Sequence, residues 1–103
     1  MNPALTFVIP IYRGAQTVAS LVKQIERASV PGGHEIVLVD DGSPDNTAEV
    51  CEALVREAIV PITFIRHSRN FGEHNAVLTG YRHARGDYVV NLDDDGQNPA
   101  GEA

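Results

Sequence analysis

Hydrophobic positions along the chain fall into four short runs that alternate with three stretches of helical period. The runs are rich in β-branched residues and end at proline, arginine or aspartate, as buried strands do. The stretches between them repeat apolar residues at spacings of three and four, for example Val18, Leu21, Val22 and Ile25. The pattern predicts strands over 5–10, 35–39, 62–65 and 88–92, and helices over 15–29, 46–58 and 73–84.

This alternation of strand and helix predicts an α/β fold. Strands joined by connections of helix length run parallel, and right-handed crossovers place helices on both faces of the sheet. We therefore expect a Rossmann-like, three-layer α/β/α domain with a four-stranded parallel sheet in the order β-α-β-α-β-α-β.

Polar residues follow each predicted strand. Sheets of this kind bind ligands beyond the carboxyl ends of their strands, where the strand order reverses. The segments that should meet there are 10–13, 40–43, 66–72 and 93–95. Acidic side chains are concentrated in two of them, so this edge of the sheet is the candidate functional site.

Composition narrows the classes of function. The 103 residues are 43% hydrophobic and 21% charged, which suits one small globular domain. A net charge of −6 disfavours a partner bound through nucleic-acid phosphates, so no nucleic acid is expected. The single cysteine, Cys51, forms no internal disulfide and sits in an apolar helical stripe, which predicts a core position and a cytoplasmic protein. No apolar run reaches the length of a membrane span.

A D-x-D pair, Asp93 and Asp95, follows the last predicted strand, with Gln97 two residues further on. Mg²⁺ and Mn²⁺ take oxygen ligands and share them between carboxylates and phosphates. Such an ion stabilises a diphosphate leaving group as a Lewis acid. A solvated acidic turn is the alternative, and the position after a parallel strand favours the metal.

Asp41 follows the second predicted strand, where its carboxylate can accept a hydrogen bond from a base N–H or a ribose hydroxyl. An ordinary turn is the alternative for this segment. Acidic and hydroxyl side chains also occupy calcium-loop positions from Asp41 to Glu52. Asn46 stands where such a loop needs glycine, and a strand precedes it, so calcium binding is disfavoured. Asn46 and Glu49 have the spacing of a helix capping box.

The segment 66–72 leads into the third predicted helix. Gly72 permits close approach of backbone to a ligand, and the free amides of a helix N-terminus favour an anion. Arg66 and Arg69 either neutralise a phosphate or balance an acidic surface. Tyr12 either stacks on a nucleobase or simply packs at its strand end. His74 shares a helical face with Val77 and Tyr81 and is expected to be half-buried, and Gly86 to end this helix.

Together these segments resemble family 2 glycosyltransferases of the GT-A fold. The matching pieces are Phe7-Val8-Ile9-Pro10-Ile11-Tyr12, 36–47, Ser68-Arg69-Asn70-Phe71-Gly72, Gly86-Asp87-Tyr88 and Asp93-Asp94-Asp95-Gly96-Gln97-Asn98-Pro99. Their order and spacing cover nearly the whole chain. Segments 70–74 and 97–99 look most like the branch that transfers sugars to polyprenyl phosphates such as dolichol or undecaprenyl phosphate.

The resemblance implies an inverting glycosyltransferase that uses a UDP- or GDP-type sugar donor and Mg²⁺ or Mn²⁺. It implies a lipid-phosphate or glycan acceptor, and a cytoplasmic location at the inner face of the membrane with peripheral association of the full-length protein. By position, the implied donor-binding residues are Pro10, Tyr12, Asp41, Asn70, Gly72, Asp93 and Asp94. The implied metal ligands are Asp93, Asp95 and Gln97.

The chain departs from the family pattern at three points. Arg13 stands where the family usually has asparagine, and Gly96 and Ala100 replace an apolar residue and a proline near the D-x-D pair. Family members also continue into an acceptor-binding half that supplies the catalytic base. We therefore expect residues 1–103 to be the donor-binding half, inactive alone, with no catalytic base assigned. The fourth strand would then be an open sheet edge, for which we expect edge-to-edge pairing in a homodimer, aggregation, or coverage by the tail.

Three other readings fit an α/β domain. A receiver-type signalling domain needs an acidic pair after the first strand and a lysine after the fifth, whereas Pro10 ends the first strand and Lys23 is the sole lysine. A dinucleotide oxidoreductase needs G-x-G-x-x-G after the first strand, which segment 9–14 lacks. A nucleotide-binding module without activity is the third.

Overall fold

The computed structural model describes residues 2–93. Its elements follow the predicted alternation, with helices shorter than the periodicity suggested. They are β1 (Leu5–Ile11), α1 (Val18–Glu26), β2 (His34–Asp40), α2 (Thr47–Arg56), β3 (Ile62–Arg66), α3 (Glu73–His83) and β4 (Tyr88–Asn91).

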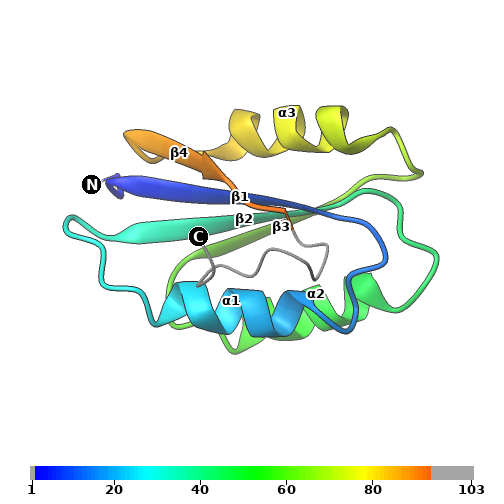
Figure 1. The fold of residues 1–103 in the computed structure, drawn as a ribbon, viewed down its shortest axis with the longest axis horizontal. Coiled ribbons are helices and arrows are strands. Elements are labelled where there is room, and N and C mark those ends of the chain that lie inside the picture. The colour runs from blue at the N-terminus through cyan, green and yellow to red at the C-terminus, as the bar shows by residue number, and fades with distance from the viewer. Residues whose placement is uncertain (1, 94–103) are drawn as a thin grey trace.

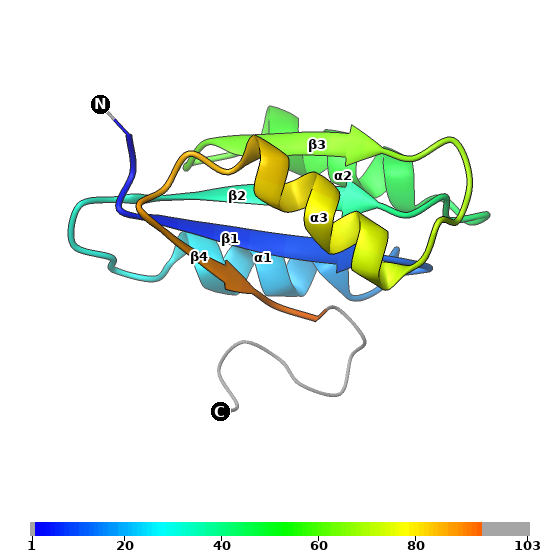
Figure 2. The same ribbon diagram turned by 90° about the horizontal axis from the view of Figure 1, so that it is seen from above.

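The four strands form one parallel sheet in the order β3-β2-β1-β4 (Figure 2). The chain moves from β1 to β2 to β3 in one direction and then returns past both to place β4 on the free side of β1. The strand order therefore reverses at β1, and the predicted parallel α/β sheet is confirmed.

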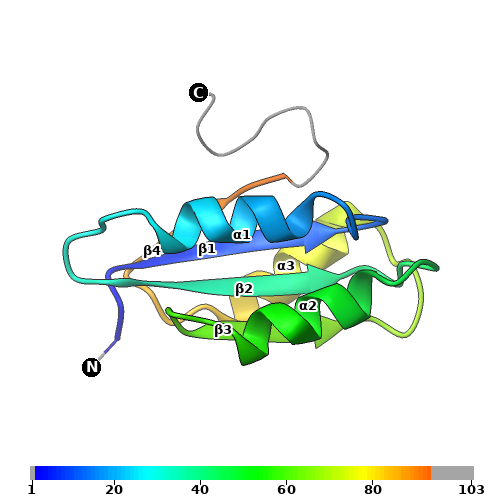
Figure 3. The same ribbon diagram turned by 90° about the horizontal axis from the view of Figure 1, so that it is seen from below.

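Helices cover both faces of the sheet, as predicted. α1 and α2 lie together on one face, and α3 crosses the other (Figures 1 and 3). The larger core cluster lies under α1 and α2, where Ile9, Ile36 and Leu38 of the sheet are fully buried. Cys51 of α2 belongs to this cluster and is fully buried, so the prediction of a core cysteine is confirmed.

α3 packs on the sheet through small residues. Ala76 and Gly80 are its buried positions, and a Cβ at Gly80 would overlap the side chain of Val8. His74 is exposed, and Tyr81 is 45% exposed. The prediction of a half-buried His74 is wrong, because the small residues and not the large apolar ones face the sheet.

Two predicted helix boundaries depend on different groups from those expected. The Asn46 side chain makes no capping hydrogen bond, and Asp45 Oδ1 accepts the Thr47 N–H at 3.1 Å in its place. Gly86 lies beyond the end of α3 and has no positive φ. Its N–H donates to Thr6 Oγ1 at 2.8 Å, and a Cβ there would lie 2.6 Å from the same oxygen. Glycine is needed for that close approach.

Pro10 ends the pairing between β1 and β4. The last hydrogen bond of this ladder runs from Leu92 N to Val8 O at 3.0 Å. In a parallel ladder the next bond would run from residue 10 to the Leu92 carbonyl, and proline has no N–H to donate. β1 and β4 therefore stop pairing at the carboxyl end of the sheet, beside the point where the strand order reverses.

β4 lies at one edge of the sheet and pairs with β1 alone among the described strands. All four of its residues are exposed. Within residues 2–93, none of the helices has both the length and the apolar character needed to cross a membrane.

Candidate functional site

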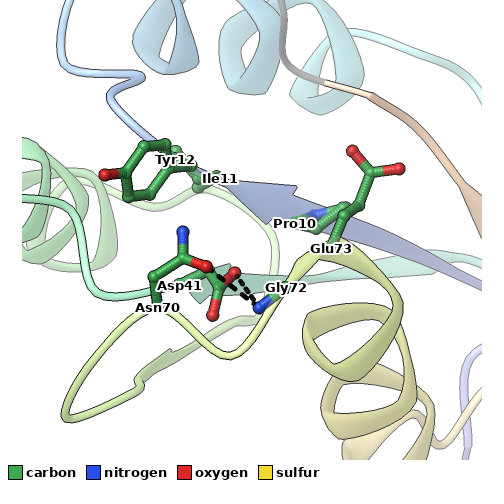
Figure 4. A pocket seen from close by; sticks show the side chains of 7 residues that line it. All are labelled: Pro10, Ile11, Tyr12, Asp41, Asn70, Gly72 and Glu73. Carbon is green, nitrogen blue, oxygen red and sulfur yellow. Dashed lines mark hydrogen bonds between the residues drawn. The ribbon is translucent and has the colours of Figure 1, made fainter.

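A pocket opens at the carboxyl end of the sheet (Figure 4). Its volume is about 220 Å³. Residues from three separate segments line it: Pro10, Ile11, Tyr12, Asp41, Asn70, Gly72 and Glu73. The five donor-site residues predicted in the first three segments therefore meet in one place.

The position of the pocket follows from the topology. β1 and β2 are neighbours and parallel, so Tyr12 and Asp41 leave the sheet at the same end. The connection from β3 passes over this end before α3 turns back across the sheet (Figure 2). Open α/β sheets bind ligands where the strand order reverses, and the pocket occupies that place.

Asp41 is the most constrained side chain in the pocket. Its residue is only 3% exposed, and its carboxylate accepts three hydrogen bonds from the chain. Phe71 N and His67 Nδ1 both donate to Oδ1 at 2.9 Å, and Gly72 N donates to Oδ2 at 3.0 Å. A carboxylate held in this way has one orientation, with acceptor capacity left on Oδ2.

The loop before α3 forms the floor of the pocket. The Gly72 N–H is shared between Asp41 Oδ2 and Asn70 Oδ1, the latter at 3.1 Å, as the dashed lines in Figure 4 show. Gly72 has a φ of 99° and is the N-cap of α3. This backbone conformation is open to glycine and strained for other residues. Asn70 and Gly72 therefore hold this loop in one conformation beside Asp41.

Tyr12 forms the opposite wall of the pocket, and Arg13 follows it in the turn after β1. Tyr12 is 45% exposed, so its ring is accessible from the pocket side. Arg13 is the one non-glycine residue with positive φ in the part of the chain that the structure describes, at 57°. Its N–H donates to Ser43 Oγ at 2.9 Å, and its guanidinium lies 5.5 Å from the Tyr12 ring centroid. The turn after β1 is thereby tied to the turn after β2.

The acidic turn after β2 is occupied with local hydrogen bonds. Asp40 Oδ1 accepts the Ser43 N–H at 3.0 Å, and Thr47 Oγ1 accepts the Gly14 N–H at 3.1 Å. The Thr47 hydroxyl donates to Asp45 Oδ1 at 2.5 Å, and this bond lowers the pKa of Asp45 from its ordinary value of 3.8. No group of three or more His, Cys, Asp or Glu side chains gathers as a metal site in residues 2–93. These hydrogen bonds hold the turn in one conformation.

Both arginines of segment 66–72 have partners within the chain. Arg66 Nε lies 3.8 Å from Asp40 Oδ2, a buried oxygen that accepts no hydrogen bond. The Arg69 guanidinium lies 4.8 Å from the ring centroid of Phe71. Neither arginine is among the residues that line the pocket. These contacts favour the alternative in which the two arginines balance acidic surface charge over the one in which they neutralise a phosphate.

The predicted metal ligands begin at the end of β4. Asp93 is exposed, and the hydrogen bond from Leu92 N to Val8 O fixes the strand immediately before it. Its carboxylate offers the oxygen donors that Mg²⁺ and Mn²⁺ prefer. Asp94, Asp95 and Gln97 lie outside the described residues.

Sequence reasoning missed two residues that line the pocket and one that supports it from behind. Ile11 and Glu73 line the pocket beside the predicted residues. His67 contacts Asp41 directly, and its other ring nitrogen lies 2.9 Å from Thr79 Oγ1. The position of His67 directly after a strand indicated that it lies at the carboxyl edge of the sheet. Nothing in the sequence pattern linked it to Thr79 on the next helix.

Comparison with protein families finds a match over residues 6–102 to the family described as Glycosyl transferase family 2. Curated relatives include undecaprenyl-phosphate 4-deoxy-4-formamido-L-arabinose transferases. The protein of that name from Shewanella sediminis is 40% identical over 100 residues, and that from Pseudomonas savastanoi pv. phaseolicola is 38% identical over 100 residues. Each alignment covers 95% of this chain and 30% of the relative. The chain therefore spans about a third of the length of these relatives.

Solved structures share the fold. A mannosyltransferase from Pyrobaculum calidifontis, in complex with GDP-Man and Mn²⁺, superposes with a TM-score of 0.82 at 27% identity. TarS 1-349 from S. aureus, in complex with UDP, superposes with a TM-score of 0.79 at 22% identity. Both comparisons cover 92% of this chain and 28% of the other. The sheet and helices are those of a GT-A fold.

Proposed function

Because the chain belongs to glycosyl transferase family 2, we propose that residues 1–103 are the donor-binding half of a glycosyltransferase that uses a nucleotide-diphosphate sugar. One observation carries the proposal: Tyr12, Asp41, Asn70 and Gly72 come from three motifs and line one pocket. Neither a receiver domain nor an oxidoreductase function predicts that these four residues meet in one pocket where the strand order reverses.

In this proposal the pocket binds the nucleoside. The accessible Tyr12 ring stacks on the base, and the remaining acceptor site on Asp41 Oδ2 takes a base N–H or a ribose hydroxyl. Pro10 closes the sheet side of the pocket and keeps β4 from extending across it. Asn70 and Gly72 hold the floor against which the donor rests.

Asp93, Asp95 and Gln97 are proposed to hold Mg²⁺ or Mn²⁺, with Asp94 beside the donor. The exposed Asp93 at the end of β4 supplies a hard oxygen ligand on the same rim as Asp41. The ion, when bound, stabilises the negative charge that grows on the diphosphate leaving group. The Mn²⁺ in the Pyrobaculum calidifontis complex supports this choice.

The acceptor is proposed to be undecaprenyl phosphate or a similar lipid phosphate, with transfer by inversion. The names of the curated relatives support this class of acceptor. An acceptor of this kind requires the whole protein to work at the inner face of the membrane, through peripheral association. The catalytic base is assigned to the part of those relatives that this chain does not span, so residues 1–103 alone are expected to bind the donor without transferring the sugar.

Calorimetric titration with UDP and GDP, with and without Mn²⁺, tests the proposal. We expect binding of one nucleotide that strengthens with Mn²⁺, and loss of the metal effect in Asp95→Ala but not in Asp94→Ala. Tyr12→Ala should weaken binding by about 10-fold, since base stacking on an aromatic ring contributes about 1–3 kcal/mol. Tyr88→Ala is the matched control, because Tyr88 is 75% exposed on β4 and does not line the pocket. Binding of neither nucleotide would overturn the proposal.

We also propose that β4 mediates a homodimer through its open edge. Tyr88 N and Leu92 N donate to β1, so the alternating N–H groups of Val89 and Asn91 point away from it. Exposed edges of this kind pair with other chains. Asn91→Pro removes one outward N–H and should reduce dimerisation in sedimentation velocity, whereas Asn91→Ala keeps that N–H and should not. A monomer at high concentration for the unmodified chain would contradict the pairing.

A further inference from the structure

We propose that His67 is a positioning residue for donor binding, acting through a relay from Thr79 to Asp41. This inference rests on the proposed function of the pocket. His67 lies just after β3, and its side chain is 12% exposed. Its two ring nitrogens contact two other elements: Nδ1 lies 2.9 Å from Asp41 Oδ1, and Nε2 lies 2.9 Å from Thr79 Oγ1.

The chemistry of these contacts defines the tautomer of the neutral ring. An ionised carboxylate only accepts hydrogen bonds, so His67 Nδ1 carries the proton that is donated to Asp41. Nε2 then has a lone pair, and the Thr79 hydroxyl donates to it. Asp41 therefore selects the tautomer, and the Thr79 hydroxyl, which can donate or accept, completes the relay by donating to Nε2.

The relay links three parts of the fold that the pocket depends on. Asp41 directly follows β2, His67 directly follows β3, and Thr79 lies in α3. The Phe71 ring packs edge-on against His67 with centroids 5.4 Å apart, and Phe71 N donates to the same Asp41 oxygen. His67 thus contacts both the carboxylate and the loop that carries Asn70 and Gly72.

The hydrogen bond from His67 helps to hold the Asp41 carboxylate so that only Oδ2 has a lone pair left for a ligand. Oδ1 is occupied by His67 and Phe71, while Oδ2 accepts only the Gly72 N–H. Loss of the His67 contact would let the carboxylate rotate and would loosen the pocket floor. His67 does not line the donor pocket, so its effect on a bound nucleotide passes through Asp41.

The first test reads the tautomer directly. Long-range ¹H–¹⁵N NMR spectra of the unligated protein should show His67 with its proton on Nδ1. Thr79→Val leaves Nε2 without its donor, so the proton should stay on Nδ1 while the ¹⁵N chemical shift of Nε2 changes; Thr79→Ser should keep the original pattern. An Nε2–H tautomer in the unmodified protein would overturn the relay.

The second test measures UDP and GDP binding in His67 variants. His67→Ala removes a hydrogen bond to a charged group and should weaken binding of the preferred nucleotide by about 10- to 100-fold. His67→Asn keeps a side-chain N–H near the position of Nδ1 and should restore binding to within about threefold of the unmodified protein.

The two tests separate this inference from the proposed function. A protein that binds neither nucleotide overturns the proposed function, and the NMR pattern still reports on the relay. Normal nucleotide binding in a folded His67→Ala variant overturns the positioning role and leaves the proposed function intact. Equal weakening in His67→Ala and His67→Asn, with unchanged thermal unfolding, would also contradict the role of the donated proton.

Discussion

Thr6 and Glu35 face each other across β1 and β2, and the Thr6 hydroxyl donates a 2.7 Å hydrogen bond to Glu35 Oε2. Both residues are buried, with Glu35 only 1% exposed. Arg85 N donates to the same oxygen at 2.7 Å, and Thr6 Oγ1 accepts the Gly86 N–H at 2.8 Å. One carboxylate at the end of the sheet opposite the pocket therefore ties β1, β2 and the turn before β4 together.

Glu35→Ala should lower the free energy of unfolding by about 3 kcal/mol, because it leaves the buried Thr6 hydroxyl and the part-buried Arg85 N–H without their acceptor. Glu35→Gln keeps one acceptor oxygen and should cost less, about 1–2 kcal/mol. Urea unfolding measures both. Glu52→Ala on the exposed face of α2 is the control and should change stability by less than about 0.5 kcal/mol. A Glu35→Ala variant as stable as the control would contradict the network.

Gly42→Ala should cost about 3 kcal/mol or more, because two effects combine there. Gly42 has a φ of 71°, and a Cβ would lie 2.5 Å from the backbone nitrogen of Asn70. Gly33→Ala is the matched control, with a φ of 85° and nothing within 4 Å of its Cβ. It should cost only the backbone strain, about 1 kcal/mol. Thermal or urea unfolding compares the pair, and equal losses would show that contact with the pocket floor is unimportant.

Arg13→Asn should raise the free energy of unfolding by about 0.5 kcal/mol, because asparagine tolerates the left-handed backbone better than arginine does. Arg13 has a φ of 57°, and the hydrogen bond from its N–H to Ser43 is independent of the side chain. Asparagine is also the residue that the family resemblance predicts at this position. Arg13→Ala retains the strain and should give no gain in urea unfolding, so stabilisation by alanine would refute the explanation.

The low pKa of Asp45 should depend on the Thr47 hydroxyl, which is the largest cause of the shift. Thr47→Val should move the pKa of Asp45 back toward 3.8, while Thr47→Ser should leave it low. Carboxyl ¹³C NMR titration measures this directly. Because the folded pKa is depressed, the stabilisation from Asp45 is present above about pH 4 and is lost as the pH falls through the folded pKa. An unmoved pKa in Thr47→Val would contradict the assignment.

Local patterning was sufficient to predict the architecture because each element carries its own periodicity. The apolar run 36–39 and the stripe of Val18, Leu21 and Ile25 indicate a buried strand and an amphipathic helix without knowledge of any neighbour. Helix-length connections then require parallel strands, and parallel strands bring Tyr12 and Asp41 to one edge. The bounds of α3 were also predicted, but its buried face was not, since that face consists of Ala76 and Gly80, which carry little hydrophobic signal.

The amino-acid order alone was enough to specify the α/β class, the edge of the sheet that carries the candidate site and the family motifs, because these depend on residues close together along the chain. The folded arrangement was needed to reveal that Pro10 stops the β4 ladder, that Asp41 is held by His67 and Phe71, and that Thr79 reaches His67 from α3. Those contacts join residues from separate elements. Their geometry depends on how closely the helix and loops approach the sheet, which no periodicity along the chain encodes.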